Sequence, residues 1–220
     1  MRLFRQNGLT IALVLLFSVS LVGQAATGWG TENAELLAHG QPALGLVAYL
    51  ASGAFLSSLF ENWESEFLQM WVFVMLTAYL VQKGSPESKA AGGAAPQDRD
   101  PALDADKPDA PWPVRAGALA RSLYSHSLGA ALLLLFLGSF ALHLVNSARL
   151  ANSENALHGE PAVTVLAHLA SPEFWFESFQ NWQSEFLSTA VLIVLAIFLR
   201  ERGSPESKPV ATPHSKTGTE

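Results

Sequence analysis

Four apolar stretches dominate this chain of 220 residues, at about 9–26, 65–82, 127–146 and 184–200. An α-helix needs about 20 mostly apolar residues to cross the hydrocarbon core of a bilayer, so each stretch is typical of a membrane span. Charged residues make up only 15% of the chain, against about a quarter in soluble domains. The chain has no cysteine, which excludes disulfides and thiolate metal sites. The sequence therefore predicts an all-α membrane protein with four transmembrane helices.

Basic residues are distributed unevenly around these stretches. Twelve of the thirteen lie before the first stretch, between the second and third, or after the fourth: Arg2, Arg5, Lys83, Lys89, Arg99, Lys107, Arg115, Arg121, Arg200, Arg202, Lys208 and Lys216. The outer segments, 27–66 and 146–185, carry ten acidic residues and only Arg149. Because basic loops stay on the cytoplasmic side, we expect both termini to be cytoplasmic. No basic patch suits nucleic acid.

The chain also contains a gapless internal repeat. Residues 2–89 align with 121–208 at an offset of 119, and 35 of the 88 positions are identical. Each copy holds two spans and enters from the same side, which predicts tandem parallel two-helix repeats related by a pseudo-two-fold axis along the membrane normal. The predicted organisation is membrane repeat 1 at 1–89, a flexible cytoplasmic linker at 90–113, membrane repeat 2 at 114–208 and a disordered tail at 209–220.

The N-terminus has two interpretations. Its basic start, apolar middle and following small residues resemble a secretory signal peptide. The same element recurs inside the chain at 121–145, where cleavage cannot be its purpose. We therefore expect the first span to be retained.

Local signals fill in each repeat. Short apolar runs at 43–50 and 162–169 are too short to span and predict short interfacial helices in the outer segments. Ser52 and Ser171 follow these runs and are typical N-caps. The stretches 54–83 and 173–202 contain no Gly or Pro, so each predicts one continuous helix of about 30 residues.

The motif NWxSEF stands at the outer end of the second span in each copy. In one interpretation its Trp residues belong to the membrane-interface belt, and its polar residues make contacts between the repeats. In the other, Glu66 and Glu185 form a symmetry-related carboxylate pair that binds a cation or carries a proton, because a carboxylate inside the membrane edge must face protein or water. The candidate residues are Asn62, Trp63, Ser65, Glu66, Asn181, Trp182, Ser184 and Glu185.

Two histidines are further candidates. His39 and His158 occupy matching positions in the polar outer segments, and Glu35 and Glu154 lie four residues before them. These four side chains could supply metal ligands if the two loops met. No tight metal-binding spacing supports this, and a lone His before Gly in a loop is usually a capping or turn residue. No metal or cofactor is therefore predicted.

The repeated HGxP, NWxSEF and GSPESK motifs give the chain a family resemblance over essentially its whole length. It resembles an uncharacterised bacterial integral-membrane family, the domain of unknown function 6766. The resemblance implies a small protein of the bacterial inner membrane. It brings no activity, cofactor or catalytic residue with it.

Function is left between two classes. No phosphate loop, nucleophile elbow or haem motif is present, which disfavours an enzyme. The preferred interpretation is a structural or interaction component of the membrane, whose partners are the lipid bilayer and either a membrane protein or another copy of itself. The alternative is a proton or cation transporter or channel that uses Glu66 and Glu185.

Overall fold

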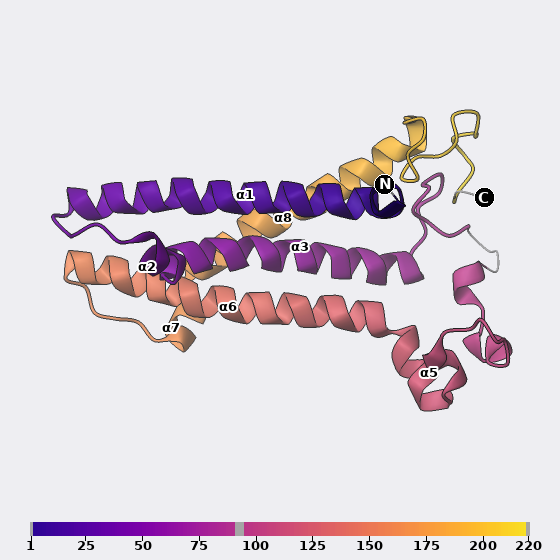
Figure 1. Cartoon of the computed structure of the whole chain (residues 1–220), viewed down its shortest axis with the longest axis horizontal. Coiled ribbons are helices and arrows are strands. Elements are labelled where there is room, and N and C mark those ends of the chain that lie inside the picture. The colour runs from indigo at the N-terminus through magenta and orange to yellow at the C-terminus, as the bar shows by residue number, and fades with distance from the viewer. Residues whose placement is uncertain (1, 91–94, 219–220) are drawn as a thin grey trace. The chain divides into compact units, whose positions relative to one another are not determined.

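The computed structural model describes residues 2–90 and 95–218, and every regular element in these ranges is helical. Figure 1 shows the elements in chain order. They are α1 (Arg2–Ala38), α2 (Leu46–Leu50), α3 (Gly53–Tyr79), η1 (Pro96–Asp98), η2 (Pro101–Asp104), α4 (Trp112–Arg115), α5 (Ala118–Ser125), α6 (Ser127–His158), α7 (Val165–Leu169) and α8 (Pro172–Phe198). The all-α prediction is confirmed for these residues.

The chain folds into two compact units, each built from two segments. The first unit comprises residues 1–61 and 141–175, and the second comprises 62–140 and 176–220. Helices α3, α6 and α8 each contribute residues to both units.

Three helices are long and apolar enough to cross a membrane: Gln6–Ala38, Ser127–His158 and Pro172–Phe198. Helix α3 has the same length as α8, 27 residues, but it does not meet the same requirement for apolar composition. At matching positions it carries Glu64, Gln69, Trp71 and Thr77 where α8 carries Gln183, Ser188, Ala190 and Ala196. Three of the four predicted spans therefore have the required length and composition, and the fourth stays a prediction.

Burial follows the pattern expected of a protein whose solvent is lipid. Among the described buried residues, twelve are polar or charged and eight are hydrophobic. Large apolar side chains such as Leu9, Val19 and Leu134 are 75%, 71% and 69% exposed. Lipid is as apolar as leucine, so interior contacts between membrane helices use small and polar residues instead. This distribution agrees with a membrane protein.

The ends of the helices differ from the sequence prediction in two ways. Helices α3 and α8 end at Tyr79 and Phe198, four residues before the predicted ends, because the following GSPESK loops draw the chain into turns. Helices α1 and α6 run to Ala38 and His158, so the outer stretches predicted as loops before HGxP are largely helical. No Pro interrupts either helix in these stretches.

The HGxP motif ends both of these long helices. Gly40 and Gly159 adopt φ values of +71° and +72°, the left-handed conformation that glycine allows just beyond a helix. The next amide then bonds back into the last turns of the helix, from Gln41 to Leu36 O at 2.8 Å and from Glu160 to Asn155 O at 2.8 Å. This is the Schellman pattern, so the spacing shared by the two copies serves helix termination.

Other local features also match between the copies. Asn7 breaks the helical geometry inside α1 (φ −128°, ψ 20°). His126, which stands 119 residues later, separates α5 from α6 (φ −116°, ψ 8°).

Ser52 Oγ accepts from the Phe55 amide at 3.3 Å. Ser171 Oγ accepts from the Phe174 amide at 3.3 Å, so both predicted N-caps are confirmed. The predicted short helices are α2 and α7.

The first unit packs through small residues and a buried ring. Gly53 begins α3, and a Cβ at this position would lie 2.7 Å from the Leu150 amide nitrogen and 2.9 Å from Asn146 O of α6. Phe174 is fully buried, and its ring centroid lies 5.0 Å from that of His143 and 5.8 Å from that of His168. Close backbone approach at a glycine is a common way for membrane helices to pack.

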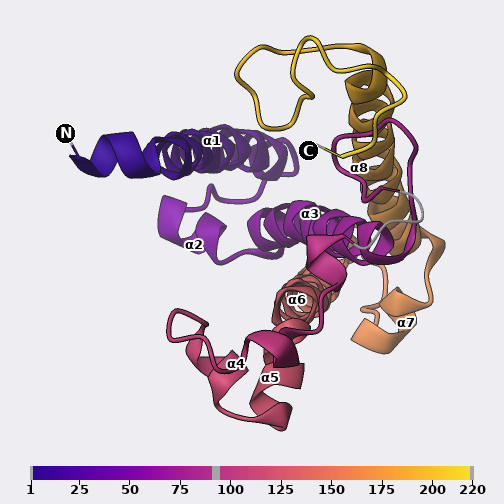
Figure 2. The ribbon, with the colours of Figure 1, turned by 90° about the vertical axis from the view of Figure 1, so that its right-hand side faces the viewer.

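The linker between the repeats is structured where it is described. Residues 91–94 lie outside the described residues, and the rest of 90–113 contains η1, η2 and the start of α4. Helices α4 and α5 pack on each other (Figure 2), and η2 contacts both. Asp104 forms ion pairs with Arg99 at 3.1 Å and with Lys107 at 2.7 Å. The hydrogen bond from Lys107 is the main reason that the pKa of Asp104 lies below its usual range.

Candidate functional site

The NWxSEF residues of the second unit lie on α3 and α8. Glu64, the variable position of the first motif, is fully buried. Its Oε1 accepts a hydrogen bond from Trp182 Nε1 of the second motif at 3.1 Å. Phe136 of α6 packs edge-on against the same Trp182 ring, with centroids 6.3 Å apart. The two motifs are therefore joined by a buried carboxylate and an indole N–H.

A second polar contact joins the same two helices further along their length. Gln69 Nε2 of α3 donates to Thr189 Oγ1 of α8 at 2.6 Å, and Thr189 Oγ1 in turn donates to Glu185 O at 3.0 Å. Interhelical hydrogen bonds of this kind fix neighbouring membrane helices against each other.

The two motif serines are satisfied within their own helices. Ser65 Oγ donates to Asn62 O at 2.8 Å, and Ser184 Oγ donates to Asn181 O at 2.8 Å. Ser65 is buried whereas Ser184 is exposed. Back-bonding of a hydroxyl to the preceding turn is the usual arrangement for a serine inside an apolar helix.

Glu66 and Glu185 are within electrostatic reach of each other. Glu66 is exposed and Glu185 is half-buried. Two carboxylates of like charge at matching positions can share a proton or a cation. The structure thus brings together the pair that the sequence singled out. Asn62, one turn before Glu66, is also exposed.

His39 and His158 also come together, in the first unit. Their rings meet edge to face with centroids 5.8 Å apart. The Nδ1 atoms lie 3.0 Å from Glu35 O and 2.9 Å from Glu154 O, which places each ring over the last turn of its helix. No group of three or more His, Asp or Glu side chains that could hold a metal occurs among residues 2–90 and 95–218.

The two GSPESK loops form a second cluster in the second unit, and they share one local fold. Gly84 and Gly203 have φ values of +87° and +94°. Ser88 Oγ accepts from the Gln82 amide at 2.9 Å, and Ser207 Oγ accepts from the Glu201 amide at 3.0 Å. The loops are thus matched turns stabilised by their own serines.

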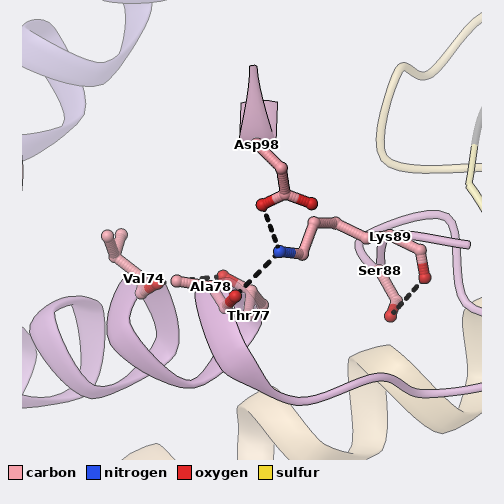
Figure 3. Close-up of polar contacts among 6 residues, drawn as sticks. All are labelled: Val74, Thr77, Ala78, Ser88, Lys89 and Asp98. Atoms are coloured by element: carbon pink, nitrogen blue, oxygen red, sulfur yellow. Dashed lines mark hydrogen bonds and ion pairs between the residues drawn. The ribbon is translucent and has the colours of Figure 1, made fainter. Parts of the chain in front are cut away.

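The lysines that end these loops are used differently. Lys89 Nζ reaches back to α3, where it donates to Ala78 O at 2.8 Å and pairs with Asp98 at 2.7 Å (Figure 3). A cation at the C-terminal carbonyls of a helix is favoured by the helix dipole. Lys208 is only 1% exposed. Its Nζ donates instead to carbonyl oxygens of the C-terminal segment, those of Pro213, His214 and Lys216, at 3.3, 3.0 and 3.1 Å.

The C-terminal segment lies on the first GSPESK loop. The Gly84 amide donates to Thr217 Oγ1 at 2.9 Å, and the Gly218 amide donates to Ser85 O at 2.9 Å. Burial and the nearby Arg200 lower the pKa of Lys208. Residues 209–218, predicted as a disordered tail, therefore make specific hydrogen bonds in the described structure.

The loops also bring two carboxyl groups together. Glu87 and Glu206 hold equivalent positions in the two motifs, and their side chains hydrogen-bond to each other. Burial, this hydrogen bond and the charge of Glu206 raise the pKa of Glu87 to about 7. A carboxyl pair of this kind retains one shared proton near neutral pH.

Sequence reasoning misses several of these residues. Glu64 does not stand out because the second copy has Gln183 in its place, and a comparison of the copies favours positions that both keep. An acidic residue within an apolar helix is the signal that could find it. Glu87 and Glu206 are the glutamates of the two GSPESK motifs. The motif shows that the chain is repeated, but it does not show that the two glutamates lie close together.

The long apolar helices and the polar interior together define the class as a helical membrane protein. More specifically, the chain belongs to the family described as domain of unknown function (DUF6766), whose model matches residues 1–219. This confirms the family inferred from the motifs. No curated protein matches the chain, and no solved structure matches it.

Proposed function

We propose that this chain is a non-enzymatic structural or interaction component of the bacterial inner membrane. In this proposal α3 crosses the membrane as the second of four spans, both termini are cytoplasmic, and the two repeats pack as parallel hairpins about a pseudo-two-fold axis. The partners are the lipid bilayer and either another membrane protein or a second copy of the chain.

One observation carries the proposal. The polar residues at the mouth of the second and fourth spans are engaged in holding α3 and α8 together, through the Glu64–Trp182 bond and the Gln69–Thr189 bond. Polar groups within apolar helices that are used in this way stabilise a bundle. The matched turns at HGxP and GSPESK likewise support a role in shaping the fold.

A specific observation favours a second candidate. Glu66 and Glu185 interact electrostatically, and Glu66 is exposed rather than used in the Trp182 contact. Carboxylates on membrane helices that face water or a cavity are typical of proton and cation pathways. The second candidate is therefore a proton or cation transporter or channel that uses this pair.

Reconstitution distinguishes the two candidates. The purified chain is placed in vesicles under a pH gradient or a sodium gradient, and its flux is compared with that of Glu66→Gln combined with Glu185→Gln. A structural component gives only leak-level flux in both proteins. A transporter instead gives wild-type flux that disappears in the double variant. Glu201→Gln is the control, because Glu201 is an exposed carboxylate, and it should leave the flux unchanged.

A further inference from the structure

Two hollows adjoin each other at the end of α3 in the second unit. The first is a groove of about 570 Å³ between α3 and α8. Its wall is mainly apolar and includes Val72, Phe73, Leu76, Leu80, Phe186 and Ile193. The second is a wider cavity of about 980 Å³ beyond the last turn of α3. Thr77, Glu87 and Ser88 line both hollows, so the groove and the cavity adjoin each other at these residues.

The wider cavity is basic. Lys83, Lys89 and Lys216 line it, and Glu87 is its only acidic lining residue among those described. Lys89 is already held by Asp98 and by Ala78 O, as Figure 3 shows. No described ion pair involves Lys83 or Lys216. These two ammonium groups therefore leave the cavity with a net positive charge even when Glu87 is ionised.

An apolar groove that opens into a basic cavity matches one kind of molecule. We propose that the two hollows together bind an anionic phospholipid, with an acyl chain in the groove and the phosphate beside Lys83 and Lys216. Basic pockets at the ends of membrane helices bind anionic lipid headgroups through charge. Burial of the acyl chain against Leu76 and Phe186 adds the apolar contribution.

Glu87 makes this site sensitive to pH. Its surroundings are Glu206, which hydrogen-bonds to it, and the three lysines of the cavity, one of them paired with Asp98. The pKa of Glu87 is raised to about 7. As the pH rises through 7, this carboxyl loses its proton and places a negative charge beside the lipid phosphate. Lipid affinity should therefore fall between about pH 6 and pH 8, and Glu87→Gln should remove most of that dependence.

Native mass spectrometry of the whole chain tests the site directly. The protein is purified in a non-ionic detergent and titrated with phosphatidylglycerol, and separately with phosphatidylcholine of the same acyl chains. The wild type should bind one phosphatidylglycerol in preference. The double change Lys83→Gln and Lys216→Gln should lower that affinity about tenfold or more, since each basic residue near an anionic headgroup contributes substantially.

Two matched controls separate the site from general effects. Arg115→Gln combined with Arg202→Gln removes the same charge from exposed residues that line neither hollow and take part in no described ion pair, and should leave the affinity within about twofold of wild type. Ala190 lines the groove, so Ala190→Phe fills the groove and should weaken lipid binding. The neighbouring Val191 does not line the groove, so Val191→Phe should leave lipid binding unchanged.

Three results would overturn the proposal. Equal affinity for phosphatidylcholine and phosphatidylglycerol would remove the role of charge. Equal losses in the two double variants would reduce the effect to net charge. Unchanged binding in Ala190→Phe would leave the groove without a ligand. If the Lys83 and Lys216 variant does not fold, the Ala190→Phe and Val191→Phe pair and the pH dependence still decide the question.

Discussion

In the first copy of the repeat, the lysine that ends GSPESK reaches back to the helix before it, whereas in the second copy the same lysine reaches forward into the C-terminal segment. The first loop is buried and the second is mainly exposed, although their serine turns match. The difference shows how duplicated sequence can keep its local fold while the contacts around it diverge. The local turn depends on the motif serines and on backbone amides just before the motif. The lysine contacts differ, because Lys89 bonds to its own helix and to Asp98, whereas Lys208 bonds to the C-terminal segment.

A pair of residues near the outer ends of the repeats also differs between the two copies. In the first copy, Tyr49 approaches Gly28 so closely that its hydroxyl occupies the space of a Cβ there. In the second copy, the equivalent residues are His168 and Ser147, whose Nε2 and Oγ atoms lie 2.8 Å apart. A large residue opposite glycine has been exchanged for a smaller residue opposite serine. The helix-to-helix contact is retained with different chemistry.

The largest difference between the copies should come from their loop glycines. Gly84→Ala and Gly203→Ala both force alanine into the left-handed region, which costs about 1–2 kcal/mol. A Cβ at Gly84 would also lie 2.6 Å from His214 O, whereas a Cβ at Gly203 would meet no atom within 4 Å. We therefore expect Gly84→Ala to lower the free energy of unfolding by about 1–3 kcal/mol more than Gly203→Ala does. Chemical denaturation in mixed micelles measures this, and equal losses would contradict the docked C-terminal segment.

The next effect concerns the variable position of NWxSEF. Glu64→Ala removes the buried acceptor of the Trp182 indole and should cost about 1.5–3 kcal/mol of unfolding free energy. Gln183→Ala, at the matching exposed position, should stay within about 0.5 kcal/mol. Comparable losses at the two positions would show that Glu64 is not a contact between the motifs. The same denaturation assay serves for both.

A smaller and more local effect is expected from the two lysines. Lys208→Met leaves three carbonyl groups of the C-terminal segment without their donor, so the amides of Thr212, Lys216 and Gly218 should exchange hydrogen about tenfold faster. Lys89→Met should leave that exchange unchanged, because Lys89 bonds to Ala78 and Asp98. Hydrogen exchange read by mass spectrometry resolves the two cases. Uniform exchange in all three proteins would mean that Lys208 does not hold the segment.

The last effect is the pH dependence of stability. The pKa of Glu87 in the folded chain is about 7, raised from 4.5, so between these values the folded state binds more protons than the unfolded state. Stability from this group is therefore present at low pH and is lost as the pH rises from about 4.5 through 7. Glu87→Gln should flatten this part of the melting-temperature profile, whereas Glu201→Gln should preserve it. A wild-type profile that rises over this range would contradict the assignment.

The sequence predicted those features that depend on neighbouring residues. The N-caps at Ser52 and Ser171 and the short helices after HGxP follow from local hydrogen-bond chemistry. Contacts between helices could not be read in the same way. The Glu64–Trp182 bond depends on how α3 and α8 are rotated about their own axes. The early ends of these helices depend on the turns that follow them, and the repeat pattern does not show the serine hydrogen bonds that stabilise these turns. The fourth predicted span is untested, since α3 is as long as α8 but does not meet the same requirement for apolar composition.

The side of the membrane on which residue 100 lies decides whether α3 crosses the bilayer. If α3 crosses the membrane with α1, α6 and α8, residues 100 and 215 are cytoplasmic and residues 40 and 160 are periplasmic. Fusions of a cytoplasm-active reporter and a periplasm-active reporter after each position measure this. We expect cytoplasmic activity at 100 and 215. If α3 does not cross, the chain has three spans, and periplasmic activity at both positions would contradict the duplicated-hairpin architecture.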